Sequence, residues 1–171
     1  QAQESFEQLH RATYWQVVRY FLRRGHGDAT ARDVTSEVFM AAWRQPQVAE
    51  VSLLWLYGVS RNLDRNHRRS ERRRSLLLDR LRHQPPPAPG ADPSDVVLVR
   101  DALSRLPVAD QEILMLSSWE GLAPAELAQV LGVSANAASV RLHRARGRLR
   151  AMLLAAPVQL SAPIDLSEAA P

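Results

Sequence analysis

The sequence predicts an all-α protein of two small helical domains joined by a proline-rich linker. Hydrophobic residues recur at spacings of three and four on both sides of segment 84–94, and no alternation typical of strands is present. That segment, QPPPAPGADPS, cannot continue a helix, because proline lacks the backbone N–H that a helix uses. We therefore expect domains over 1–83 and 95–154, with a semi-extended spacer between them and a mobile tail over 155–171.

Glycines and a proline divide the N-terminal domain into three or four helices. The first ends at Gly25 and Gly27, the second covers about 29–44 and stops before Pro46, and the third begins near Ser52. The expected core consists of the hydrophobic residues at helical spacing: Phe6, Leu9, Tyr14, Val17, Phe21, Val34, Val38, Ala41, Ala42, Leu53, Leu56, Val59 and Leu63.

The C-terminal domain should contain four helices, the last two of which resemble a helix-turn-helix. Ala128 is small enough for a close helix crossing, and Gly132 suits a sharp turn because glycine tolerates positive φ. Ser134 is well placed to cap the helix that follows. The buried stripe of that helix should be Ala138, Leu142, Ala145 and Leu149.

The positive charge of the chain gathers in two places. All 22 basic residues are arginine, and the net charge is +4. Nine arginines lie in 61–83, and five lie in 139–150 without any acidic residue. Two separate basic clusters indicate a protein that binds a polyanion at two places. A helix with one apolar and two basic or polar sides fits a DNA major groove, although a helical hairpin with a solvated basic face has the same pattern.

The composition excludes several kinds of site. The chain has no cysteine, which rules out disulfides and thiol catalysis, and its five histidines lack a metal-binding spacing such as HExxH. We therefore expect no metal and no cofactor. No apolar run approaches the length of a membrane span, and no signal peptide is apparent. Because the chain begins with Gln1 rather than methionine, we expect the natural start to be missing or trimmed.

Three segments together resemble one family. They are DVTSEVFMAAWR at 33–44, WLYGVSRNLDRNHRR at 55–69, and the helix-turn-helix segment LPVADQEILMLSSWEGLAPAELAQVLGVSANAASVRLHRAR at 106–146. In this order, with a proline-rich linker, they resemble the extracytoplasmic-function (ECF) sigma factors, promoter-specificity subunits of bacterial RNA polymerase. The resemblance covers about 3–153 and implies region 2-like and region 4-like domains without a catalytic site of their own.

The resemblance implies a polymerase-docking surface on the second helix. Its candidate residues are Asp33, Ser36, Glu37, Phe39 and Trp43. Carboxylates and aromatic rings suit a basic coiled-coil partner. Phe39 and Trp43 equally suit the core, and Ser36 stands where the family usually has a longer glutamine.

The third helix resembles the family's −10 element reader. Its candidates are Trp55, Tyr57, Arg61, Asn62, Arg65, Arg68 and Arg69, of which the last three would contact phosphates. Aromatic rings and asparagine can stack on unpaired bases and bond to their edges. The loop 46–52 occupies the place of the family's pocket for a flipped base. Trp55 and Leu56 equally suit the core, whereas Asn62 has less structural reason to be there.

The last helix corresponds to the family's −35 element reader. Its candidates are Asn136, Ser139, Arg141, His143, Arg144, Arg146 and Arg148. Ser139 replaces the usual lysine and removes one long contact. The implied partners are core polymerase (β′ clamp and β flap), promoter DNA and an anti-sigma factor. The implied state is a cytoplasmic monomer outside its complexes. Because the two basic surfaces lie on separate domains joined by a flexible linker, we expect their spacing to be fixed only by docking.

Two other classes remain as alternatives. A stand-alone helix-turn-helix regulator would need a dimer interface and a sensor region, and the N-terminal half instead offers a second nucleic-acid surface. A nuclease would need a catalytic constellation that the sequence lacks. Binding to purified core polymerase separates a sigma factor from both.

Overall fold

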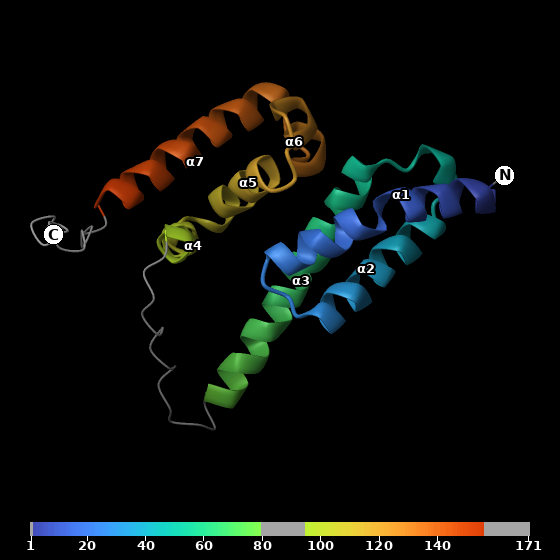
Figure 1. The fold of residues 1–171 in the computed structure, drawn as a ribbon, viewed down its shortest axis with the longest axis horizontal. Helices are drawn as coiled ribbons and strands as arrows, with labels where there is room; N and C mark the ends of the chain where they lie inside the picture. The colour runs from blue at the N-terminus through green and yellow to red at the C-terminus, as the bar shows by residue number, and fades with distance from the viewer. Residues whose placement is uncertain (1, 80–94, 156–171) are drawn as a thin grey trace, which may run out of the picture.

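Two helical bundles make up the computed structural model, which describes residues 2–79 and 95–155. The first contains α1 (Ala2–Arg23), α2 (Asp28–Trp43), the 3-10 helix η1 (Val48–Glu50) and α3 (Leu53–Asp79). The second contains α4 (Asp95–Arg105), α5 (Val108–Ser118), α6 (Pro124–Leu131) and α7 (Ala135–Ala155). Figure 1 shows the two bundles meeting where α6 approaches the first half of α3. The described ranges contain helices and no strand, so the predicted all-α class is confirmed. The predicted linker at 84–94 and the tail beyond residue 155 lie outside them.

Local signals set most helix ends. Gly25, with φ +90°, follows the end of α1, and Gly132, with φ +66°, turns the chain between α6 and α7. Both backbone conformations strain residues that carry a Cβ atom. The hydroxyls of Ser52 and Ser134 accept hydrogen bonds from the backbone N–H groups three residues later, each at 3.2 Å. These caps satisfy N–H groups that the first helical turn leaves unpaired.

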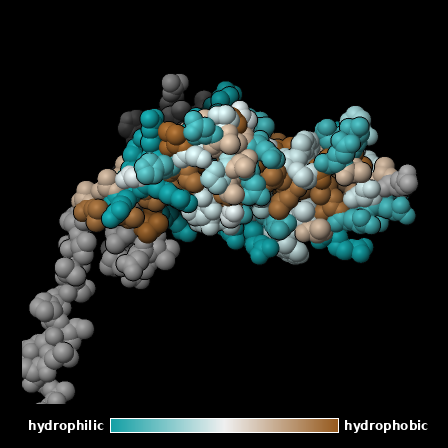
Figure 2. Space-filling model, turned by 90° about the horizontal axis from the view of Figure 1, so that it is seen from above, coloured by the Kyte–Doolittle hydropathy of each residue, from teal (hydrophilic) through white to brown (hydrophobic). Residues whose placement is uncertain are grey.

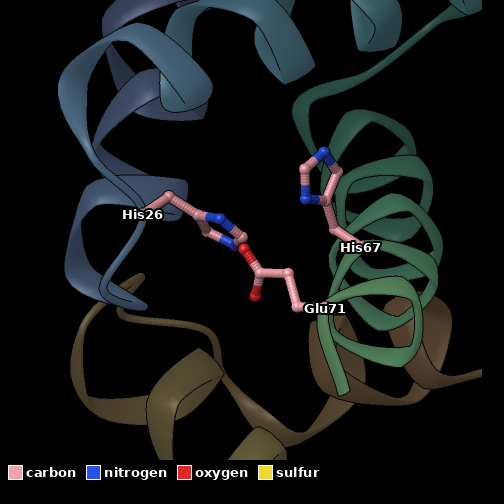
Figure 3. A group of neighbouring side chains, drawn as sticks. All are labelled: His26, His67 and Glu71. Atoms are coloured by element: carbon pink, nitrogen blue, oxygen red, sulfur yellow. The ribbon is translucent and has the colours of Figure 1, made fainter. Parts of the chain in front are cut away.

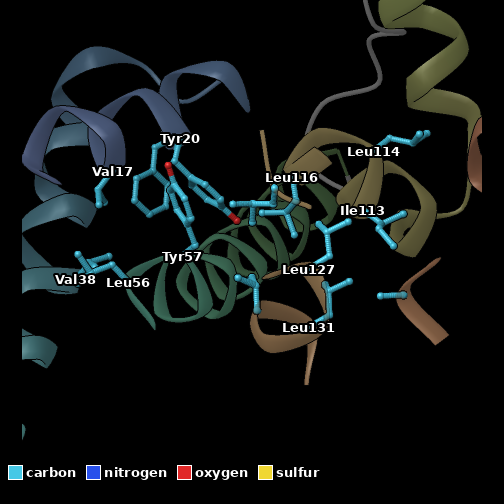
Figure 4. Close-up of a cluster of buried hydrophobic side chains, with 14 of the residues drawn as sticks. Val17, Tyr20, Val38, Leu56, Tyr57, Ile113, Leu114, Leu116, Leu127 and Leu131 are labelled. Carbon is cyan, nitrogen blue, oxygen red and sulfur yellow. The ribbon is translucent and has the colours of Figure 1, made fainter. Parts of the chain in front are cut away.

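A single hydrophobic cluster runs through both bundles. From the first bundle it includes Val17 and Leu56, and from the second Leu116 and Leu127, all fully buried. In Figure 4, Val17 and Leu56 lie on the side of the first bundle, Leu116 and Leu127 lie on the side of the second, and Tyr20 and Tyr57 lie between them. The two halves therefore share buried surface, whereas the sequence predicts domains whose spacing is fixed only by docking.

The predicted apolar stripe of α7 faces its own bundle. Ala138, Leu142 and Ala145 are buried, and Leu149 is packed against the core while partly exposed. Ala128 is buried on α6, which packs closely against α7. The opposite side of α7 is thereby left to the solvent. None of the described helices is both long and apolar enough to cross a bilayer.

Candidate nucleic-acid interfaces

The first candidate surface is the solvent side of α7. The side chains expected there are all exposed: Asn136, Ser139, Arg141, His143, Arg144, Arg146 and Arg148. Within the described residues, Arg141 and Arg144 make no hydrogen bond or ion pair, whereas Arg146 donates to the Ser117 hydroxyl at 3.2 Å. Free guanidinium groups on an exposed helix can bind phosphate or guanine without first breaking an internal contact.

Arg148 differs from its neighbours on α7. Its Nε donates to the buried Asp110 carboxylate at 2.5 Å, which ties α7 to α5. This hydrogen bond raises the pKa of Arg148 above its ordinary value. Because Asp110 has little contact with water, Arg148 serves first as its counter-charge.

The second candidate surface is the start of α3, where the predicted residues separate into two groups. Asn62 is exposed, and its side chain makes no hydrogen bond with the described residues. Trp55 is partly exposed and packs against the core on one side. Tyr57, in contrast, is only 3% exposed and stacks on Tyr20 at a ring distance of 5.6 Å. Burial, assisted by Glu120, raises the pKa of Tyr57 to about 12. The ring of Tyr57 is therefore part of the core and unavailable to DNA in this conformation.

Two hollows border this part of α3. One of about 220 Å³ lies against the loop after α2 and is lined by Pro46, Gln47, Val51 and Trp55, with Gln45 and Glu50. The other, about 430 Å³, contains Trp55, Arg61 and Asn62 on its α3 side. Gln129 and Val130 of α6 close its opposite side. The second bundle thus partly covers the predicted −10 surface.

The arginines of α3 have different environments. Arg61 donates to Glu112 of α5 at 2.7 Å, a contact between the bundles. Arg68 donates to Asp64 at 3.0 Å and to the backbone oxygen of Arg24. Burial alone would raise the pKa of Asp64, but hydrogen bonds from His26 and Arg68 lower it overall. Arg65 and Arg69 are exposed and unpaired among the described residues.

A buried ion pair fastens the two bundles together. The Arg24 side chain is 1% exposed and the Glu120 side chain 2%, and they meet at 2.9 Å. Arg24 also lies over the Tyr20 ring, with its central carbon 3.4 Å from the ring centroid. Arg23 adds a bond to Glu120 at 3.2 Å and another to the backbone oxygen of Trp119. This pair could not be predicted from the sequence, because two single charged residues far apart along the chain give no sign that they meet.

The third candidate surface is a groove between α1 and α2. It encloses about 570 Å³ and is lined by Phe6, Glu7, His10, Ser36, Phe39, Met40 and Trp43, with Gln3 at its end. Trp43 is 51% exposed and packs edge-on against Phe6, whereas Phe39 is buried as its floor. Asp33 and Glu37 are exposed on the same helix, and the Ser36 hydroxyl donates to the backbone oxygen of Arg32. Of the two aromatic residues predicted for this surface, Trp43 is accessible and Phe39 belongs to the core.

Hydrophobic side chains also remain on the surface of the free chain. Met40 is exposed and lines the same groove as Trp43, and unlike Trp43 it was not predicted from the sequence. Figure 2 shows brown hydrophobic groups between the teal polar ones on the face seen there. Exposed apolar groups beside charges are typical of surfaces that bind other macromolecules.

Comparison with known proteins agrees with the helix-turn-helix and extends beyond it. The family model for sigma-70, region 4 matches residues 97–149. The ECF RNA polymerase sigma factor SigL of Mycobacterium tuberculosis is 32% identical over 152 residues, covering 84% of each chain. The RNA polymerase sigma factor NccH of Alcaligenes xylosoxydans xylosoxydans is 30% identical over 163 residues, covering 88% of this chain and 86% of that protein.

Solved structures have the same fold. The sigma factor RpoE, in a complex with the anti-sigma factor NepR from Bartonella quintana, aligns with a TM-score of 0.63 at 20% identity, over 88% of this chain and 98% of that one. CnrH, in complex with the cytosolic domain of CnrY, aligns with a TM-score of 0.59 at 28% identity, over 90% of each chain.

A helical bundle followed by a sigma-70 region 4 helix-turn-helix defines a class of bacterial transcription-initiation proteins. Similarity along most of the chain narrows the class further. The chain belongs to the ECF RNA polymerase sigma factor family.

Proposed function

We propose that this chain is an alternative sigma factor that binds core RNA polymerase, recognises −35 and −10 promoter elements and assists promoter melting. The observation that carries the proposal is the division of α7 into a packed side and a free basic side. Ala138 and Leu142 fix the helix on its bundle, while Arg141 and Arg144 are exposed and have no partner among the residues that the structure describes. The stand-alone regulator remains the alternative.

The −35 element is read as duplex by the exposed side of α7. A guanidinium can donate two hydrogen bonds to the O6 and N7 atoms of guanine, which specifies that base in the major groove. Asn136 and Ser139 lie near the start of the helix and offer shorter contacts. We assign base reading to the free arginines and leave Arg148 with Asp110.

Replacing Arg141 or Arg144 with alanine should weaken transcription from a −35-dependent promoter. Loss of a bidentate guanine contact costs about 1–3 kcal/mol, while loss of a phosphate contact weakens binding to all sequences alike. In vitro transcription with promoter variants distinguishes the two. Arg105→Ala, which removes an exposed arginine of α4, is the matched control. Normal activity of both α7 variants, with core binding intact, would show that α7 is not the recognition helix.

The −10 element is captured as single strand by the start of α3 and the loop before it. Asn62 is free to bond to a base edge, and Trp55 offers part of its ring for stacking. Arg65 and Arg69 have no partner within the described part of the chain and can bind phosphates directly, whereas Arg61 and Arg68 must first release their acidic partners. We leave Tyr57 out of this set because of its burial.

Core polymerase docks on the groove between α1 and α2. Trp43 and Met40 supply exposed apolar anchors, and Asp33 and Glu37 supply negative charge on the same helix. This chemistry suits a basic partner helix, such as the coiled coil of the polymerase clamp. Phe39 supports the groove from beneath.

An anti-sigma factor is a further partner of this function. Both solved relatives described above are held in complexes, RpoE with the anti-sigma factor NepR and CnrH with the cytosolic domain of CnrY. We propose that the free chain is a monomer in the cytoplasm until one of its partners binds.

The free chain should bind promoter DNA poorly and direct initiation only together with core polymerase. The reason is that α6 and Glu112 contact the −10 surface of α3. The −10 surface is therefore partly covered while the −35 surface of α7 is exposed. An in vitro transcription assay with and without core enzyme, combined with DNA binding by the free chain, tests this. Tight promoter-specific binding by the free chain would favour the stand-alone regulator instead.

A further inference from the structure

Three potential metal ligands converge beside the turn between α1 and α2. His26 belongs to this turn, while His67 and Glu71 lie four residues apart on one face of α3. One ligand atom from each lies within 4.8 Å of the other two. Figure 3 shows the three side chains directed toward one another. The sequence alone predicts no metal site, because these residues meet only when the turn packs on α3.

The two histidines are prepared for a ligand in different ways. The Nδ1 atom of His67 is buried and has no hydrogen-bond partner. A buried nitrogen without a partner is costly to fold, so an occupant at this place would remove a penalty. His26 is held by Asp64, whose carboxylate oxygen lies 2.6 Å from its Nε2. With the proton of neutral His26 on Nε2, its Nδ1 lone pair is left free, an arrangement common behind metal-bound histidines.

We propose that His26, His67 and Glu71 bind one divalent zinc ion, with water as the fourth ligand. Bonds of about 2.0–2.2 Å place tetrahedral ligand atoms about 3.3 Å apart, so the cluster has to contract by up to about 1.5 Å. Glu71 is exposed and can make most of that movement by a change of rotamer. The ion would join the α1–α2 turn to α3.

The ligand set distinguishes zinc from harder cations. Imidazole nitrogens favour zinc and other late first-row metals, whereas magnesium and calcium prefer sets made of oxygen atoms. The neighbouring charges point the same way. Arg68 lies beside the cluster, and Asp64 is already bonded to Arg68 and His26. Zinc binding must therefore depend on coordinate bonds to the three ligands rather than on attraction by surrounding negative charges.

The test is zinc binding by the untagged full-length chain, measured by isothermal titration calorimetry. We expect one ion per chain, a higher melting temperature with zinc, and reversal of that shift by a chelator. His67→Gln and Glu71→Gln should each weaken binding at least tenfold, because each removes one ligand. His143→Gln removes an exposed histidine of α7 and should leave binding unchanged.

Cobalt supports an independent measurement. Substitution of Co²⁺ for zinc should give the intense visible absorption of a tetrahedral site in the wild-type chain, and a much weaker one in Glu71→Gln. Two results would overturn the proposal. One is the absence of zinc binding at millimolar concentration. The other is binding that persists unchanged in both His67→Gln and Glu71→Gln, which would place the ion elsewhere.

Discussion

Replacing Glu120 with alanine is expected to separate the two bundles of the free chain. Its carboxylate is the buried counter-charge of Arg24, at 2.9 Å. Removing one partner of a buried ion pair destabilises the folded state by about 3–5 kcal/mol, because the other charge stays buried without a counter-charge. Separation returns Arg24 to water, so the cost should appear as lost contact between bundles rather than as unfolding of either. Small-angle X-ray scattering should record a larger radius of gyration for the variant.

Two further variants make this result specific. Asp101→Ala breaks an exposed ion pair with Arg105 and should leave the scattering unchanged, since such pairs contribute about 0–1 kcal/mol. The double variant Arg24→Met with Glu120→Leu replaces both charges by apolar groups and should restore part of the compact form. An unchanged radius for Glu120→Ala, together with a lower melting temperature, would instead make the pair a support of the individual bundles.

Replacing Asn62 with alanine is expected to reduce open-complex formation while leaving the closed complex nearly unchanged. The reason is that the proposed contact forms only after a −10 base has left the stack. A bidentate hydrogen-bonded contact of asparagine to a base edge contributes about 1–3 kcal/mol. Permanganate footprinting measures the melted region. On a template already mismatched across the −10 element, unpairing is complete beforehand, and much of the defect should disappear.

The control for this experiment lies one turn further along the helix. Asn66→Ala removes an exposed asparagine of α3 that we do not assign to DNA, and it should leave melting intact. Because Asn62 makes no hydrogen bond within the described residues, its loss should change thermal stability very little. An equal defect on both templates, with a lower melting temperature, would make Asn62 a structural residue and rule out strand capture.

Helix ends were predictable from the sequence because their causes are local. Gly25 and Ser134 act on residues within one turn of themselves, and the structure has their helix boundaries where these residues indicate. The apolar stripe of α7 was equally predictable, since a helical period depends on spacing alone.

The candidate site was only partly predictable, because burial depends on partners from elsewhere in the chain. Tyr57 and Trp55 look alike as aromatic residues at the start of one helix. Tyr20 of α1 covers Tyr57, however, while Trp55 borders two hollows. The ion pair of Arg24 with Glu120 was invisible for the same reason. Nothing near either residue in the sequence distinguishes a buried charge from a solvated one.

The contact between Arg61 and Glu112 has a consequence for the salt dependence of DNA binding. In the free chain, the Glu112 carboxylate pairs with the guanidinium of Arg61, which we assign to contact with the −10 strand. Added salt weakens DNA binding, because release of the counterions condensed on the phosphates gains less entropy when the bulk salt concentration is higher. The same salt weakens the attraction that holds Arg61 to Glu112, although part-buried charges are screened less than exposed ones. The DNA affinity of the free chain should therefore fall less steeply with salt concentration than the number of its phosphate contacts predicts. A variant with separated bundles should show the full salt dependence.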